Sequence, residues 1–272
     1  MSEPPFTVGI EEEYLLVDLS TRDVADDPPQ QLLRECTEQG GGQISLEFLR
    51  SQLEVGTRVC RTLADARQDL ARLRRIIVET ARRYGLAPIA ASSHPFARAV
   101  RQKRTERETY LALATEMQAA VRRMMVCGMH VHVGVDDDDL RVDLVNQFSY
   151  FLPHLLALSC SSPFWEGEAT GLKSFRLTVY NSLPRTGLPE RFESYGELRR
   201  HLDTLVRNGL IEDTTKIWWD LRPSPRYPTI ETRIMDCCTS IDDSVCLAAL
   251  TTVILRMLYR LRLANQSWRL YP

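Results

Sequence analysis

The sequence predicts an α+β fold, in which helices pack on one face of an antiparallel or mixed sheet and the other face stays open and polar. Strand-like segments recur along the 272 residues and are separated by helices of very unequal spacing. Two of these strands carry charged side chains on one face, whereas the strands of a doubly wound parallel sheet are apolar on both faces. No repeat, low-complexity tract or linker divides the chain, so we expect a single domain.

The first third of the chain predicts two strands and a long helix. Residues 7–17 place β-branched and aromatic residues on alternate positions, as in a strand. Residues 43–57 follow a glycine turn and indicate either an extended pair or a helix. Residues 63–84 place apolar side chains three or four positions apart, which predicts an amphipathic helix that ends at Gly85. A short buried strand is expected at 86–93.

Three further helices are predicted. The capping box T-x-x-E at 105–108 would open a helix that runs to about residue 125. The acidic run at 136–139 indicates a solvated turn and a helix N-terminus, and an uncharged, buried helix is expected within 146–165. A last apolar helix is expected over 240–262, with a serine as its N-cap.

Three further strands are predicted in the second half of the chain. Residues 128–135 alternate strictly, so that His130 and His132 share one face of the strand and apolar side chains take the other. Residues 173–191 indicate a strand that enters a loop rich in proline and glycine. A late strand is expected at 229–238.

Composition and charge exclude several classes of function. The 34 Lys and Arg residues nearly balance 36 Asp and Glu residues, for a net charge of -2, which excludes a general electrostatic nucleic-acid binder. The uncharged stretch at 146–165 contains Pro153, His154 and four serines, so we do not expect it to span a membrane. The N-terminus lacks the pattern of a signal peptide, and seven cysteines without a C-x-x-C pair indicate reduced thiols. We expect a cytoplasmic protein without nucleic-acid or membrane partners.

The chemistry is predicted by carboxylates, because common nucleotide and nucleophile motifs are absent from the sequence. Neither G-x-x-x-x-G-K-[ST] nor G-x-G-x-x-G, G-x-S-x-G or H-E-x-x-H occurs. An isolated buried carboxylate is strongly penalised, so several on one strand face require cations, and bound Mg²⁺ is the simplest explanation. The candidates are Glu11, Glu13, Glu47, Glu54 and Glu231.

Two histidines extend this candidate site. An imidazole from His130 or His132 is compatible with Mg²⁺ or Mn²⁺, whereas a zinc site would more often offer sulfur or several histidines. The residues alone leave alternatives open. The glutamates at 11–13 are equally typical of a solvated edge strand, the histidines could be structural, and a zinc- or manganese-dependent hydrolase built around them is a further hypothesis.

Seven segments in order resemble one known family. They are GIEEE at 9–13, SQLE at 51–54, SHPF at 93–96, GMHVHVG at 128–134, LPRTGLP at 183–189, IWWDLRPSP at 217–225 and ETRIMD at 231–236. This set resembles the glutamate–cysteine ligase superfamily, and most closely its type 2 carboxylate–amine ligases. The resemblance extends from Phe6 to about Tyr271.

The resemblance implies a glutamine-synthetase-like catalytic domain over 1–272, in which an antiparallel sheet forms a funnel with metal ions and ATP at its floor. It implies that a carboxylate, typically the γ-carboxylate of glutamate, attacks the γ-phosphate of ATP, and that an amine then displaces phosphate from the acyl phosphate. The implied partners are small carboxylates and amines, the implied cofactors are ATP and Mg²⁺ or Mn²⁺, and a homodimer is expected.

The resemblance also assigns roles to residues. The expected metal ligands are Glu11, Glu13, Glu47, Glu54, His130 and Glu231. The expected catalytic residues are Arg233, Glu231 and His130, and the expected nucleotide or substrate contacts are Arg233, His132, Arg222 and Arg185. The family continues beyond the point where this sequence stops, so the chain is expected to lack a C-terminal helical extension. A shortened homologue that binds nucleotide without turnover is therefore an alternative function.

Overall fold

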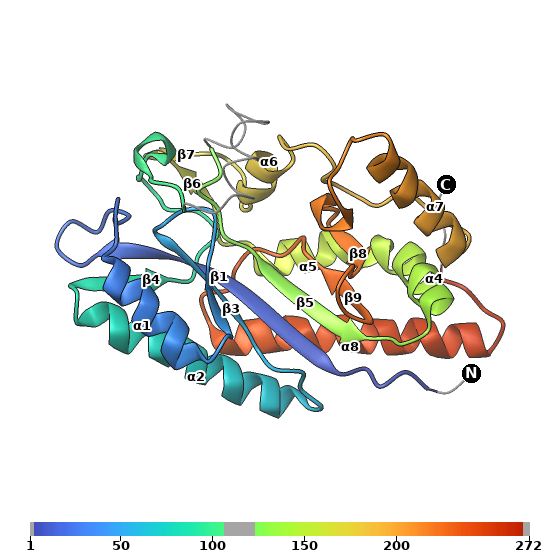
Figure 1. Ribbon diagram of the computed structural model, residues 1–272. Coiled ribbons are helices and arrows are strands. Elements are labelled where there is room, and N and C mark those ends of the chain that lie inside the picture. Colours follow the sequence, from blue (N-terminus) through green and yellow to red (C-terminus); the bar gives the residue numbers. More distant parts are fainter. Residues whose placement is uncertain (1–2, 106–122, 269–272) are drawn as a thin grey trace.

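The computed structural model describes residues 3–105 and 123–268 and has the predicted α+β fold (Figure 1). A seven-stranded sheet has the order β2-β3-β1-β5-β9-β8, and β4 pairs with β1 beside this path. Every pair in the sheet is antiparallel. The strands are β1 (Val8–Asp18), β2 (Ile44–Leu46), β3 (Gln52–Gly56), β4 (Leu86–Ile89), β5 (Met129–Gly134), β8 (Leu221–Pro223) and β9 (Thr229–Thr232).

The central strand β1 separates the apolar core from the open face of the sheet. Its side chains alternate, so that Ile10 and Tyr14 are buried among the core, whereas Glu11 and Glu13 are half-buried on the other face. Eleven residues make β1 long enough to pair with β5 through its first part, with β3 through its middle and with β4 at its end. The strand predicted at 7–17 is thus confirmed.

Helices cover the apolar face of the sheet. In Figure 1, α2 and α8 run below the sheet, and both contact β1 and each other. The helices are α1 (Gln30–Gly40), α2 (Leu63–Arg82), α4 (Asp138–Phe148), α5 (Leu152–Ser159), α6 (Arg176–Tyr180), α7 (Tyr195–Arg207) and α8 (Ile241–Leu263). Short 3-10 turns lie at Ala99–Arg101, Ser149–Phe151 and Thr214–Lys216, and a small hairpin joins β6 (Phe164–Trp165) to β7 (Glu168–Ala169).

Helix α2 forms as its apolar spacing predicts. Leu70, Leu73 and Ile77 are fully buried on one side, while Thr62 and Asp65 close a capping box at its start. The chain leaves the helix through Gly85, whose φ of 71° lies in the left-handed region that glycine adopts without strain.

Helix α8 is long and apolar enough to cross a membrane by length and composition alone. In the structure its inner side contacts α2, α4 and the sheet, and Leu247, Leu255 and Leu258 are buried there. It therefore serves as a core helix, and its N-cap is Ser240, as predicted.

Several predicted elements need correction. The strand expected at 173–191 is wrong, because this segment pairs with no long strand and forms α6 instead. The expected strand at 229–238 ends at Thr232, and the helix expected within 146–165 is interrupted by a 3-10 turn before Pro153.

The remaining predictions resolve as follows. Residues 43–57, for which helix and strand were both open, form β2 and β3. The helix predicted to start in the box at 105–108 lies largely outside the described residues. Helices α1 and α7 were not predicted.

Candidate active site

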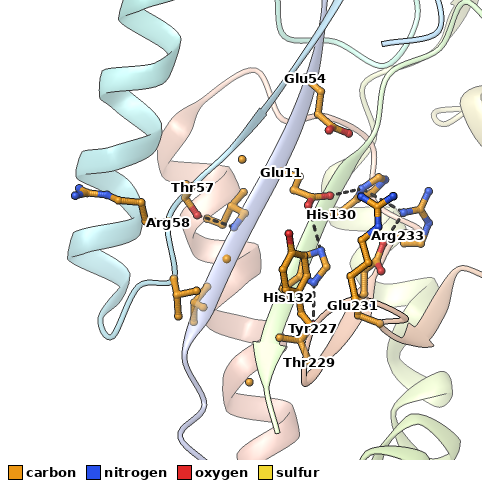
Figure 2. Close-up of a pocket in the computed structure, with 18 of the residues that line it drawn as sticks. Glu11, Glu54, Thr57, Arg58, His130, His132, Tyr227, Thr229, Glu231 and Arg233 are labelled. Atoms are coloured by element: carbon orange, nitrogen blue, oxygen red, sulfur yellow. Dashed lines mark hydrogen bonds and ion pairs between the residues drawn. The ribbon is translucent and has the colours of Figure 1, made fainter. Parts of the chain in front are cut away.

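The open face of the sheet carries a cavity of about 770 Å³ (Figure 2). Its walls come from β1, β2, β3, β5 and the β8–β9 hairpin, which lie far apart in the sequence. Nine of the predicted site residues line it: Glu11, Glu13, Glu47, Glu54, His130, His132, Arg222, Glu231 and Arg233. The cavity thus joins the acidic strand positions to both histidines and two arginines.

Strand register brings these side chains together. Across the antiparallel pairs, Glu11 lies opposite His130 and Glu13 lies opposite Glu54. On the other side of β5, His132 lies opposite Glu231. Directly opposed residues on one sheet face have Cβ atoms about 5 Å apart, so each pair is within reach of a shared ligand.

Glu11 is the centre of the site. Its carboxylate lies 3.1 Å from Nδ1 of His130 and 3.4 Å from Nε2 of His132, and Figure 2 shows it pointing toward both rings. Burial alone would raise the pKa of Glu11, but hydrogen bonds to the two histidines outweigh burial and hold this pKa well below its usual range. Burial and the charge of Arg233 lower the pKa of His130 to about 4. At neutral pH the site therefore offers an ionised carboxylate beside a neutral imidazole, which are the forms that bind metal.

The opposite end of the site is acidic. Glu13 accepts hydrogen bonds from the backbone N–H of Gly128 at 2.8 Å and from Nε2 of Gln52 at 3.3 Å. Burial, followed by the charge of Glu47, raises the pKa of Glu13 to about 7. Burial and the neighbouring glutamates also raise the pKa of Glu54 well above its usual value. Such mutual repulsion is relieved when a cation binds among the carboxylates.

The donor set fits divalent cations that prefer oxygen. Within the described residues, three overlapping groups bring their ligand atoms within 4.8 Å of one another. They are Glu11 with His132 and Glu231, Glu11 with Glu54 and His130, and Glu13 with Glu47 and Glu54. These groups consist of carboxylates and imidazoles without sulfur, which suits Mg²⁺ or Mn²⁺.

Two arginines pair with Glu231 on β9. Nε and Nη2 of Arg222 donate to the two carboxylate oxygens of Glu231 at 2.9 and 3.1 Å, and Arg233 also donates to Glu231. Burial would raise the pKa of Glu231, but the charges of Arg233 and Arg222 outweigh it and lower this pKa well below its usual range. Arg233 makes a further hydrogen bond of 3.1 Å to the hydroxyl of Tyr180. Glu231 therefore holds both guanidinium groups at the edge of the metal-ligand cluster.

Arg185 is the predicted site residue that the structure places elsewhere. Its guanidinium donates to the carbonyl oxygens of Lys216 at 3.0 Å and Leu210 at 3.2 Å, and it lies over the ring of Trp218. It does not line the cavity. These contacts are those of a residue that braces a loop, so the expected substrate contact has no geometric support.

Sequence reasoning missed residues that support the site. Tyr180 holds Arg233, and the buried Arg176 donates to the carbonyl oxygens of Arg233 and Ile234. Both lie in the segment that was interpreted as a strand, which hid their position. A Cβ on Gly128 would lie 2.3 Å from Nη2 of Arg176, so the glycine that precedes β5 makes room for this guanidinium.

The family model for glutamate–cysteine ligase family 2 matches residues 7–270. This chain belongs to the glutamate–cysteine ligase family 2. A relative from Rhodospirillum rubrum, named "Putative glutamate–cysteine ligase 2", is 58% identical over all of this chain and 71% of its own length. A relative of the same name from Jannaschia sp. is 53% identical over 99% of this chain and 71% of its own length. The predicted family is confirmed.

Solved structures of low sequence identity share the fold of this ligase-family chain. A bifunctional glutathione synthetase from Pasteurella multocida matches with a TM-score of 0.73 and 16% identity, over 92% of this chain and 39% of its own. Glutamate–cysteine ligase from Francisella tularensis, solved in complex with AMP, matches with a TM-score of 0.70 and 13% identity, over 100% of this chain and 69% of its own. Together with the observed sheet, these matches confirm the fold class.

Proposed function

We propose that this chain is an ATP-dependent carboxylate–amine ligase that activates the γ-carboxylate of glutamate or a similar acid. Membership of the glutamate–cysteine ligase family supports a ligase of this type. The observation that carries the proposal is the convergence of acidic side chains from β1, β3 and β9 with Arg233 around one cavity. Such a cluster suits a polyphosphate with its divalent cations.

The proposed metal ligands fall into the three groups described above. They are Glu11, Glu13, Glu47, Glu54, His130 and Glu231, with His132 beside them. Bound Mg²⁺ or Mn²⁺ would neutralise the phosphate charge that otherwise repels an attacking carboxylate. The glutamate with the low pKa, Glu11, is ionised at any working pH, while the neutral His130 adds a nitrogen donor without adding charge.

The chain's own residues supply the remaining charge complementarity. Arg233 presents a planar guanidinium to the cavity and is held by Glu231 and Tyr180, so its orientation is set before substrate enters. Arg222 is held in the same way by Glu231. We assign Arg233 to the transferring phosphoryl group and Arg222 to nucleotide or substrate carboxylate.

The reaction proceeds in two balanced steps. A carboxylate oxygen of the acid forms a bond to the γ-phosphorus of ATP, and the bond between this phosphorus and the β–γ bridging oxygen breaks to release ADP. The nitrogen of the amine then forms a bond to the acyl carbon, phosphate leaves with the former carboxylate oxygen, and the amine loses a proton. An amide, ADP and phosphate result.

The test is ADP release from ATP, Mg²⁺, glutamate and a panel of amines, repeated with Mn²⁺. We expect ADP release that depends on both the acid and the amine. If the γ-carboxylate carries ¹⁸O, one labelled oxygen should appear in the released phosphate. Unlabelled phosphate, or folded protein without turnover in either metal, would refute the proposal.

Matched variants sharpen this test. Glu11→Gln should abolish turnover and metal-dependent ATP binding while the far-ultraviolet circular dichroism stays unchanged. The reason is that Glu11, on β1, contributes its carboxylate to two of the three ligand groups. Glu38→Gln, an equal change at an exposed position on α1, should retain full activity. Wild-type activity in Glu11→Gln would discredit the metal assignment.

We also propose a cytoplasmic location. The reaction consumes ATP, and all seven cysteines are free in the structure. Fractionation of cells that express the tagged chain tests this, and recovery in a membrane or secreted fraction would contradict it.

A further inference from the structure

The SHPF segment at 93–96 takes no part in the carboxylate cavity. It lines a second cavity of about 760 Å³, and no residue that lines the first cavity also lines the second. The walls of the second cavity come from α2, from β4 and from the segments at 90–96 and 161–164. Its volume is in the range of small-molecule sites.

The lining of the second cavity is mainly apolar, and part of it is open to solvent. Four large apolar side chains that line it, Leu19, Val78, Phe96 and Phe164, are between 36% and 47% exposed. The two segments that carry the aromatic rings are tied together, because Oγ of Ser93 donates to the carbonyl oxygen of Phe164 at 2.8 Å. Exposed apolar side chains around a preformed hollow are typical of a ligand site.

The charges at the second cavity are positive. Among the described residues, its charged lining side chains are Arg22 and Arg74, and no carboxylate lines it. The guanidinium of Arg74 is already paired with Glu12 at 2.8 Å. Arg22 is exposed and makes no ion pair with the residues that the structure describes. The cation available to a ligand is therefore Arg22, and it favours an anionic group.

His94 fixes Arg22 relative to an aromatic ring. The φ of Arg22 is 63°, a left-handed conformation that is uncommon outside glycine and that is found at ligand clamps. Its carbonyl oxygen accepts a hydrogen bond from Nε2 of His94 at 2.9 Å, while Nδ1 of His94 accepts the N–H of Ala97 at 2.9 Å. The imidazole also lies edge-on to Phe96, with the ring centroids 4.6 Å apart. The histidine of the SHPF segment thus holds the backbone of the cation and the ring in one arrangement.

We propose that the second cavity binds a small aromatic carboxylate, with its ring against Phe96 and Phe164 and its carboxylate on Arg22. A cationic ligand would find no carboxylate among the described lining residues, and an uncharged ligand would leave Arg22 without a partner. A polyphosphate would need more than one available cation. The site stands apart from the carboxylate cavity, so its ligand is independent of the proposed reaction.

Titration of the full chain with cinnamate, followed by ligand-observed NMR, tests the proposal, and cinnamyl alcohol is the uncharged control. We expect saturable binding of cinnamate that is about fivefold tighter than binding of the alcohol, because the alcohol cannot form the ion pair. Arg22→Gln should remove this difference. Equal binding of acid and alcohol by the wild type, or no saturable binding of cinnamate below about 10 mM, would overturn the proposal.

Charge changes at Val78 on α2, which lines the second cavity and is 40% exposed, locate the site. Val78→Glu should weaken cinnamate binding and Val78→Lys should strengthen it, whereas Val206→Glu on α7, where the wild-type residue is 36% exposed, should leave it unchanged. Arg233→Gln should also leave it unchanged, because Arg233 lines the other cavity. Loss of binding in Arg233→Gln, with both Val78 variants like the wild type, would place cinnamate in the carboxylate cavity and overturn the proposal. Circular dichroism shows whether each variant is folded.

Discussion

Replacing Glu13 by glutamine should stabilise the metal-free protein at pH 8 and leave its stability near pH 4 almost unchanged. The folded state raises the pKa of Glu13 from 4.5 to about 7, first by burial and then by the charge of Glu47. The folded protein therefore retains a proton that the unfolded chain has already lost. The free energy of unfolding of the wild type therefore declines as pH rises from 4.5 to about 7, and glutamine at position 13 removes this decline.

The size of the effect follows from the same shift. A difference of roughly 2.5 pKa units, at about 1.36 kcal/mol per unit, limits the gain in the free energy of unfolding of Glu13→Gln to about 3 kcal/mol above pH 7. The amide oxygen of glutamine can still accept the N–H of Gly128, so this contact, 2.8 Å in the wild type, need not be lost.

Urea denaturation of both proteins in EDTA, followed by tryptophan fluorescence from pH 4 to pH 8, measures the difference. Added Mg²⁺ should stabilise the wild type, since ligands that bind only the folded state raise its stability, and should stabilise Glu13→Gln less. The exposed control Glu38→Gln should show no such trend. A variant that is equally destabilised at both pH values would refute the reasoning.

Three further predictions concern the framework around the site. Arg74→Met should lower the free energy of unfolding by about 3–5 kcal/mol, because it leaves the buried carboxylate of Glu12, which lies 2.8 Å from Nη2 of Arg74, without its cation. A loss below about 1 kcal/mol in thermal denaturation would contradict this. Gly128→Ala should lower both the melting temperature and the activity, because its Cβ would collide with Arg176, and unchanged values would show that the guanidinium moves freely. Burial would raise the pKa of Asp69, but hydrogen bonds from the backbone N–H of Arg58 and from the side chains of Gln43 and Arg72 outweigh burial and hold this pKa below its usual value. The contribution of Asp69 to the free energy of unfolding should therefore be lost as pH falls through the lowered pKa. Asp69→Asn should abolish this acid-dependent loss, and denaturation curves with the same pH dependence in variant and wild type would argue against it.

The sequence by itself determined which side chains face the cavity wherever a strand was correctly predicted. Alternation is a local property with a period of two, so Glu11 and Glu13, or His130 and His132, share a face whatever lies beside them. Helix α2 was predictable for the same reason, because the spacing of its apolar residues and the glycine that follows it are both local features of one segment. The family motifs extended this local information to the choice of ligase chemistry.

Tertiary structure alone decided which residues meet. The register that sets Glu11 against His130 and Glu13 against Glu54 depends on how distant strands pair, and no single segment contains that information. The same holds for Arg222, which pairs with Glu231 across a hairpin, and for Arg185, which contacts loop carbonyls outside the cavity. Residues 176–180 alternate like a strand yet form a helix, and the buried guanidinium of Arg176 in this helix donates to carbonyl groups of a neighbouring segment. Local pattern sets the direction of a side chain, whereas its partner is set by the packing free energy of the whole fold.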